Sequence, residues 1–225
     1  MLLAGKTVAR ACHALPAHDH ALADARFRRL VGDAQLGELP LAVRRRFSKR
    51  LAPGETALYR GQVVTIELSR AGRVLAFLGR AVGAPLPLTD GATGAAIVAV
   101  TEDEAAGGQL WTRSYARPGR FPQVVHSAKR FRGPTGLEEY VGCGIGMTLT
   151  VAVEERALVF RSSGYFLDLG AWRLKLPRWL APGRMEIVHR EEVAGGRFSF
   201  RLTLPHPRLG RLLHQLAWFE DVAAA

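Results

Sequence analysis

The feature that most constrains this chain is a regular alternation of apolar and polar residues that begins near residue 93 and continues almost to the C-terminus. In the segment MTLTVAVE, residues 147–154, apolar side chains occupy every second position, which is typical of a strand with one buried face. Ten such runs are separated by turn residues, at 93–102, 110–116, 121–132, 137–141, 147–154, 158–167, 172–176, 185–193, 198–204 and 212–219. The sequence therefore predicts a strongly curved antiparallel sheet or an incomplete barrel of about ten strands.

Before residue 93 the spacing of apolar residues is mostly helical. A short helix is predicted from Phe27 to the stop at Gly37, and a second from Pro40 to Pro53-Gly54. A strand over 57–68 leads to Ser69, the predicted N-cap of a third helix that ends at Gly83. Its apolar stripe consists of Val74, Phe77, Leu78, Ala81 and Val82. The fold class is therefore α+β, with two or three N-terminal amphipathic helices packed on the sheet.

Length and composition indicate one folded domain. A chain of 225 residues with 48% hydrophobic and 23% charged residues suits a single all-β or α+β unit, predicted over 25–225. Residues 1–24 lack a clear period and are predicted to be a poorly ordered leader. Two cysteines, Cys12 and Cys143, cannot form a disulfide framework. No apolar run is long enough for a secretory signal or a membrane span, so a cytoplasmic location is expected.

The net charge of +11 suggests an anionic partner. Within 26–50, eight basic residues stand against two acidic ones, which predicts a basic helical stripe. This stripe is either a solvated helix face or a docking surface for an acidic protein or an anionic membrane. Nucleic acid is not expected, because one aromatic residue, Phe47, lies near the run of arginines at 44–46 and the segment has no binding motif. The predicted docking residues are Arg44, Arg45, Arg46, Lys49 and Arg50.

A hairpin turn at Gly195-Gly196 predicts the pairing of the two neighbouring strands. If Val193 faces Phe198, then Glu191 faces Phe200 and His189 faces Leu202, and all share one apolar face. An inward histidine and glutamate must pair, lie at a rim or face a cavity, because burying a charge alone is costly. His189 and Glu191 are therefore a candidate ligand-binding or acid–base pair, with a satisfied structural pair as the alternative.

A second hairpin at Pro118-Gly119 predicts that Trp111 faces His126 and that Arg113 and Tyr115 lie on the same side. Aromatic rings beside one arginine can cover an apolar ligand and hold its polar end, so these four residues are predicted to bind ligand. The alternative is a cation–π stack on the outer face of the sheet. An error of one residue in the register would exchange the faces.

Metal and cofactor signatures are weak. His13, His18 and His20 lie in the predicted leader with no second cluster of ligands at a supporting spacing, so no metal is expected. The glycines of GCGIG, residues 142–146, precede a strand and not a helix, which favours a tight bend over a phosphate site. No cofactor is expected.

Four segments in this order resemble a known family: FRRLVG with LPLAVRRRF, then WTRSY, then WRLKLPRWLAPG, and finally GGRFSFRLTLPHPRLGRLL. Together they resemble the bacterial domain of unknown function 4166 over residues 25–220. Ala217 departs from that pattern, which has glycine there. Members of the family resemble stand-alone domains or appendages to an NAD-binding domain of the saccharopine dehydrogenase type, which implies a redox or membrane-lipid context and no defined activity.

The leading functional hypothesis from the sequence is a binding module that holds an apolar or lipid-like molecule inside the curved sheet. The alternatives are a cofactor-free isomerase, hydrolase or decarboxylase that uses His189 and Glu191, and an accessory domain that docks on an NAD-dependent dehydrogenase.

Overall fold

A computed structural model describes residues 24–83, 86–87, 94–192 and 196–222. Eleven strands of this part form one antiparallel sheet. Their bounds are β1 (Thr56–Leu68), β2 (Gly94–Asp103), β3 (Gly108–Arg117), β4 (Arg120–Arg130), β5 (Glu138–Gly142), β6 (Ile145–Glu154), β7 (Ala157–Asp168), β8 (Arg173–Lys175), β9 (Glu186–Glu191), β10 (Phe198–His206) and β11 (Gly210–Asp221). The helices are α1 (Arg26–Val31), α2 (Asp33–Glu38), α3 (Leu41–Ser48) and α4 (Arg70–Ala81).

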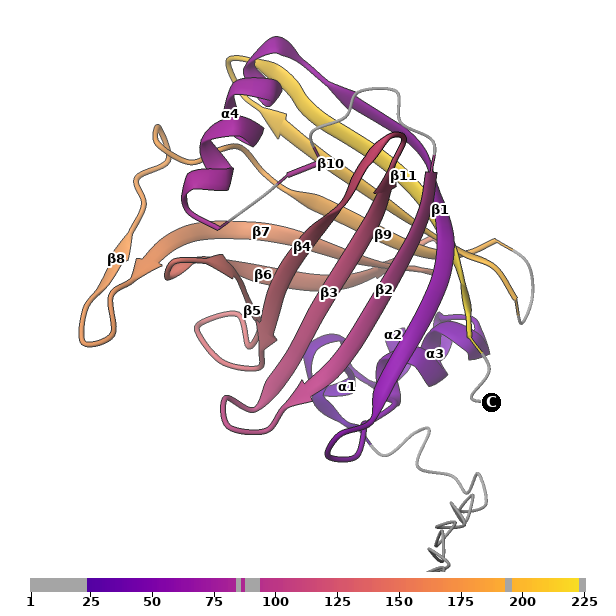
Figure 1. The fold of residues 1–225 in the computed structure, drawn as a ribbon. Helices are drawn as coiled ribbons and strands as arrows, with labels where there is room; N and C mark the ends of the chain where they lie inside the picture. Colours follow the sequence, from indigo (N-terminus) through magenta and orange to yellow (C-terminus); the bar gives the residue numbers. More distant parts are fainter. Residues whose placement is uncertain (1–23, 84–85, 88–93, 193–195, 223–225) are drawn as a thin grey trace, which may run out of the picture.

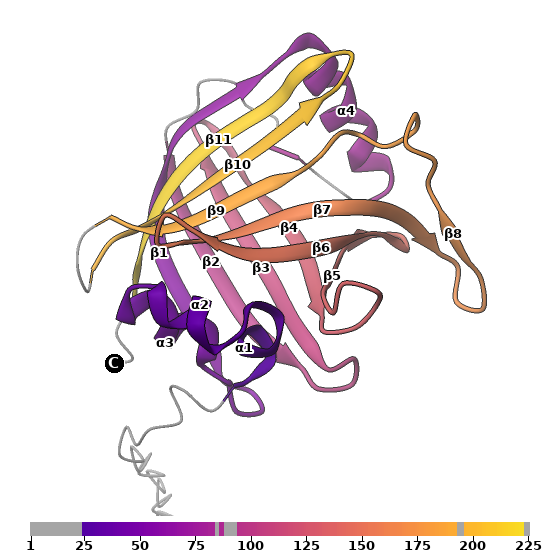
Figure 2. The same ribbon diagram turned by 180° about the vertical axis from the view of Figure 1, so that it is seen from behind.

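The sheet closes into a barrel. Its strand order is β6-β5-β4-β3-β2-β1-β11-β10-β9-β7-β8, and a further pairing joins β6 to β7. Ten strands therefore form the barrel, and β8 pairs with the end of β7 outside it (Figures 1 and 2). The predicted α+β class with about ten antiparallel strands is confirmed, and the closure that the sequence left open is complete.

Helices α1, α2 and α3 lie across one end of the barrel, which we call the closed end (Figure 2). Phe27 of α1 and Phe47 of α3 are buried there and meet edge to face at 5.0 Å between ring centroids. The single helix predicted from Phe27 to Gly37 is divided in two, because Gly32 takes a φ of +84° that no helix contains. The helix predicted after Pro40 is confirmed.

Helix α4 lies at the opposite end of the barrel, which we call the mouth (Figure 1). Its predicted N-cap is confirmed, because the Ser69 hydroxyl accepts a hydrogen bond from the Gly72 N–H. The face toward the barrel carries the small residues Gly72 and Ala76, whereas the large apolar residues of the stripe remain exposed. A Cβ at position 72 would lie 1.9 Å from the Leu212 carbonyl oxygen, so glycine sets how closely α4 approaches β11.

The far end of α4 meets the turn between β5 and β6. A Cβ at Gly142 would lie 2.4 Å from the Gly83 carbonyl oxygen, which shows how closely the two segments pack. Helix α4 therefore extends from β11 toward the opposite wall of the barrel. The predicted leader lies outside the described residues, apart from Asp24. Among the described residues, no helix is both long and apolar enough to cross a lipid bilayer.

Candidate binding cavity

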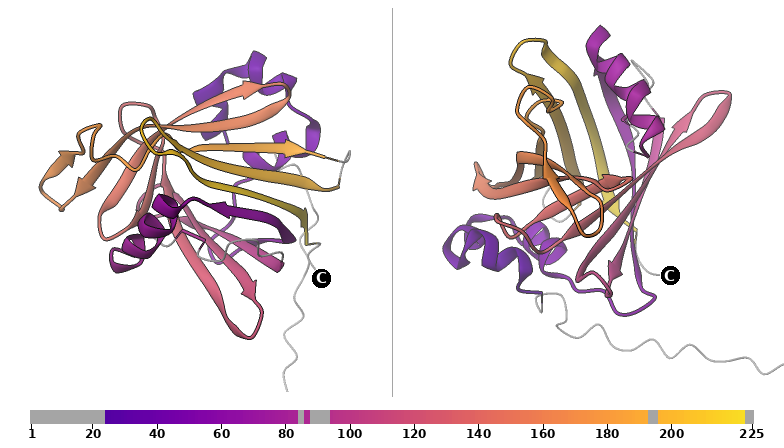
Figure 3. Two further views of the ribbon diagram at one scale, coloured as in Figure 1. Left: turned by 90° about the horizontal axis from the view of Figure 1, so that it is seen from above. Right: turned by 90° about the vertical axis from the view of Figure 1, so that its left-hand side faces the viewer.

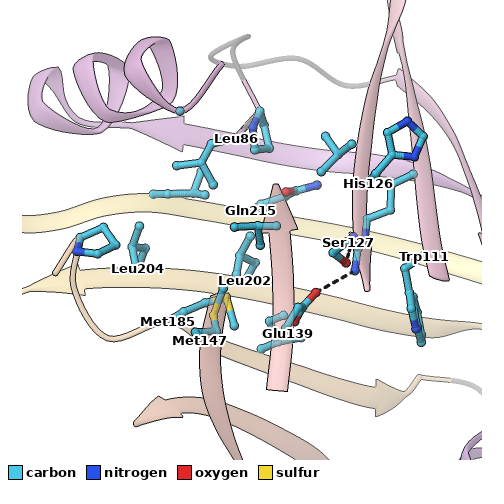
Figure 4. Close-up of a pocket in the computed structure, with 18 of the residues that line it drawn as sticks. Leu86, Trp111, His126, Ser127, Glu139, Met147, Met185, Leu202, Leu204 and Gln215 are labelled. Atoms are coloured by element: carbon cyan, nitrogen blue, oxygen red, sulfur yellow. Dashed lines mark hydrogen bonds and ion pairs between the residues drawn. The ribbon is translucent and has the colours of Figure 1, made fainter. Parts of the chain in front are cut away.

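A cavity of about 470 Å³ occupies the barrel between the mouth and the closed end (Figure 4). Its lining is mostly apolar and comes from strands on all sides of the barrel. Phe47 of α3 contributes to the lining from the closed end. Leu78 of α4 and Leu180 of the segment between β8 and β9 line the cavity at the mouth and remain more than half exposed. The cavity therefore has a floor at α3 and opens between α4 and the 177–182 segment.

One wall of the cavity carries a cluster of charged residues from three adjacent strands, Arg113 of β3, Lys129 of β4 and Glu139 of β5. The Lys129 Nζ lies 3.0 Å from a Glu139 carboxylate oxygen, and an Arg113 guanidinium nitrogen lies 3.6 Å from the other. Arg113 also donates a hydrogen bond to the Ser127 hydroxyl at 3.0 Å. Lys129 and Glu139 are almost fully buried, whereas the Arg113 side chain keeps 19% of its surface accessible.

The electrostatics of this cluster follow from its burial. Burial lowers the pKa of Lys129, and the attraction of Glu139 only partly opposes that effect. Burial alone would raise the pKa of Glu139, but Lys129 and Arg113 outweigh it and hold this pKa below its ordinary value. The Lys129 Nζ also lies 4.8 Å from the centre of the Trp111 ring. The cluster thus holds two cationic side chains and one carboxylate in an apolar wall.

The four residues predicted from the β3–β4 hairpin all belong to the cavity lining. Trp111, Arg113 and Tyr115 line the cavity from β3. The predicted pairing of Trp111 with His126 is wrong by one residue, because the register shifts between Tyr115 and Arg117 and Trp111 pairs with Ser127. His126 also lines the cavity but is exposed. Its Nδ1 lies 3.1 Å from the Thr112 hydroxyl, and its ring turns away from Glu139 (Figure 4).

The other predicted pair, His189 and Glu191, lies outside the cavity lining. The predicted register of β9 and β10 is wrong by two residues, since Glu191 pairs with Phe198 and His189 with Phe200. A shift of two residues preserves the faces, and His189 does point inward, where it is fully buried beneath α3. Glu191 is only partly buried at the end of β9. The arrangement gives neither residue access to the cavity.

His189 is enclosed by aromatic rings and one arginine. Its ring centroid lies 5.0 Å from that of Phe47 and 4.8 Å from that of Phe198. The Arg46 guanidinium lies 3.1 Å from the His189 Nε2 and also donates to the Asp221 carboxylate. Because Arg46 carries only donors, Nε2 must be the acceptor, and His189 is neutral. Burial, with Arg46 adding to it, holds the pKa of His189 well below 6.5.

This buried neutral histidine predicts a loss of stability in mild acid. The unfolded chain binds a proton at His189 below about pH 6.5, whereas the folded state does not until a much lower pH. Stability therefore falls as the pH drops from 6.5 toward the folded pKa, by up to about 1.4 kcal/mol per pH unit. Urea unfolding at pH 7.5 and 5.5 should show wild type losing about this much more than His189→Phe. An equal loss in both proteins would contradict the assignment.

Sequence reasoning missed Lys129 and Glu139, although both have a signal. In the strand predicted over 121–132, Lys129 lies two residues after Ser127 and so shares its face of the sheet. In the next strand, Glu139 shares a face with Leu137 and Val141. Strict alternation therefore places both on an inward face once the one-residue shift near residue 116 is known. Within the described residues, no group of three or more histidine, cysteine or acidic side chains could hold a metal ion. Cys12, His13, His18 and His20 lie outside them.

Fold and cavity together define a closed antiparallel barrel with an apolar interior, plugged by short helices at one end. The family pattern described as a domain of unknown function, DUF4166, matches residues 39–219. The chain belongs to this family, as its sequence segments indicated. The comparison with curated proteins gives no match.

Proposed function

We propose that this protein binds one apolar or lipid-like small molecule inside the barrel. The observation that supports the proposal most directly is the 470 Å³ cavity, whose lining is apolar except at the Arg113–Lys129–Glu139 cluster and a few polar neighbours. Ligand sites in proteins commonly have volumes of roughly 300–1,000 Å³ and combine an apolar lining with a few convergent polar groups. A well-packed barrel of this size would instead fill its interior with side chains.

The charged cluster indicates the chemistry of the polar end of the ligand. Arg113 and Lys129 together exceed the charge of Glu139 by one, and Arg113 is the member that remains accessible from the cavity. A hydrogen-bond acceptor with negative charge would complete the pairing, and a carboxylate matches the guanidinium fork. The ligand is therefore an amphiphile with an apolar body and a carboxylate or similar acceptor at one end.

The alternatives from the sequence receive less support from the geometry. An acid–base mechanism on His189 and Glu191 would require both side chains to reach a substrate, and neither lines the cavity. Docking on a dehydrogenase stays a prediction. We therefore place the function in binding and not in catalysis.

The proposal is tested with a fluorescent polyene fatty acid and its methyl ester, titrated into protein purified without detergent. We expect the acid to bind with one-to-one stoichiometry, and Leu202→Trp, which fills the cavity from β10, to abolish binding. Ile97→Trp on the outer face of β2 is the matched control and should bind as wild type does. Absence of binding by the wild type, or full binding by Leu202→Trp, would overturn the proposal.

The role of the charged cluster has its own readout. Arg113→Met keeps the aliphatic stem but removes the charge. It should lower the affinity for the acid about tenfold or more and leave the affinity for the ester unchanged, because a hydrogen bond to a charged group contributes about 1.5–3 kcal/mol. Circular dichroism of each variant verifies the fold. An equal loss of affinity for the acid and the ester would show that Arg113 does not bind a carboxylate of the ligand.

A further inference from the structure

The mouth of the barrel carries an unusual set of exposed aromatic residues. Among the described residues, the four most exposed large apolar side chains are Phe121 (92%), Trp179 (78%), Trp172 (72%) and Phe77 (68%). They belong to the start of β4, the segments on either side of β8, and α4. These elements all lie at the mouth end, with α1–α3 at the other (Figures 1 and 3). Exposed aromatic residues concentrated at one end of a protein indicate a site of interaction.

The same end carries most of the net charge of the described residues. The segments that form it contain eleven basic residues and one acidic residue, Asp168. Asp168 is partly buried and accepts a hydrogen bond from Tyr140, and Glu67 at the adjoining end of β1 pairs with Arg211. These mouth segments are 69–83, 116–121, 142–146, 168–184 and 205–211.

The closed end is electrically balanced, although it contains the basic helical stripe. Its segments hold thirteen basic and thirteen acidic residues, at 24–56, 103–108, 130–138, 154–157, 190–192, 196–198 and 219–222. Arg26 pairs with Asp24 and Glu102, and Arg46 pairs with Asp221. Four of the eight basic residues of the stripe therefore have an acidic partner within 4 Å. At the mouth, Arg173 lies beside Glu138 and Arg211 beside Glu67. Because basic residues outnumber acidic ones there by eleven to one, the larger uncompensated charge lies at the mouth.

We propose that the mouth docks on the surface of a membrane that contains anionic phospholipid. Tryptophan and phenylalanine enter the interfacial region, while arginine places its aliphatic stem beside them and its guanidinium among the headgroups. The positive charge is complementary to such a surface. A second copy of the chain is disfavoured as the occupant, because two mouths face to face would bring together two strongly positive surfaces.

Docking in this orientation places the opening of the cavity against the bilayer. Leu78 and Leu180 line the cavity and are also exposed at the surface of the mouth. They would therefore form an apolar path from the lipid to the barrel interior. The consequence, which rests on the proposed function, is that the bound amphiphile is loaded from or delivered to the membrane without crossing water. The docking itself depends only on the mouth residues.

The experiment is co-sedimentation of the protein with vesicles of phosphatidylcholine alone or with about 30% phosphatidylglycerol. We expect binding to the anionic vesicles that weakens strongly when salt shortens the Debye length from about 10 Å to a few ångströms. Two double variants alter the mouth, Arg120→Glu with Arg178→Glu and Phe121→Ser with Trp179→Ser. Each should weaken binding at least tenfold without changing the circular dichroism spectrum, since these side chains are exposed.

Matched controls change the same properties elsewhere. Arg45→Glu with Arg50→Glu makes the same charge change at the closed end, and Leu41→Ser with Ile97→Ser removes exposed apolar groups away from the mouth. Both should bind vesicles as wild type does. The proposal would be overturned if the protein bound neutral and anionic vesicles equally, or if the control variants lost as much binding as the mouth variants. It would also be overturned if the protein bound no vesicles, including the case in which it captured an acidic protein instead.

The two proposals fail separately. Leu202→Trp blocks the cavity without altering the mouth surface, so it should bind vesicles normally. Vesicle binding that survives while the fatty acid does not bind to wild type would overturn the cavity function alone. Fatty-acid binding without vesicle binding would overturn the membrane docking alone.

Discussion

Glu139→Gln should lower the free energy of unfolding by about 3–5 kcal/mol. The substitution removes the carboxylate that lies 3.0 Å from the Lys129 ammonium and leaves that cation buried in an apolar wall. Glu154→Gln is the matched control, because Glu154 pairs with Arg161 at the surface, where such pairs contribute about 0–1 kcal/mol. Urea unfolding at pH 7 measures both. A cost below about 1 kcal/mol for Glu139→Gln would contradict the buried pair.

Two further measurements identify the cause of this loss. Lys129→Met in the Glu139→Gln background should restore most of the stability, because it removes the unpaired charge. The stability of Glu139→Gln alone should also rise from pH 7 to 9. Burial keeps the pKa of Lys129 in the folded state below 10.5, so the unfolded state binds more protons than the folded state in this pH range. The free energy of unfolding therefore increases as the pH rises.

The fold was largely predictable because the signal that specifies it is repeated. Alternation in each strand follows from having one face in the barrel, and an error in one strand leaves the others unaffected. Ser69 was predictable for a local reason, since a hydroxyl before a helical run satisfies a free backbone N–H. The break at Gly32 was not, because one glycine within a helical pattern does not show whether the chain will adopt a positive φ there.

The site was predictable only in part, because it depends on long-range register. One shift near residue 116 moved His126 to the other face and brought Ser127 and Lys129 inward. For β9 and β10 the error was two residues, so His189 kept its inward face. What the sequence could not show is that α3 covers His189 and separates it from the cavity. The helical period of α4 likewise did not reveal that Gly72 and Ala76, and not Phe77, face the barrel.

Phe47→Ala should lower the free energy of unfolding by about 3–5 kcal/mol, the usual cost of removing a buried phenylalanine. The ring packs against Phe27, Phe160 and His189 and is 4% exposed. Leu41→Ala on the same helix is the control and should cost less than about 0.5 kcal/mol, since Leu41 is half exposed. Urea unfolding followed by circular dichroism measures both.

The floor that Phe47 forms gives this variant a second expected result. Removing the ring deepens the cavity toward α1, so a fatty acid with a longer chain should gain affinity relative to a shorter one. Hydrogen exchange shows whether the helices α1–α3 and the barrel unfold together or separately. If α1–α3 open separately from the barrel, Phe47→Ala would raise exchange only in residues 24–50 and leave the unfolding of the strands unchanged. A uniform loss of protection across helices and strands would instead show that the helical floor and the barrel unfold together, as their shared aromatic core requires.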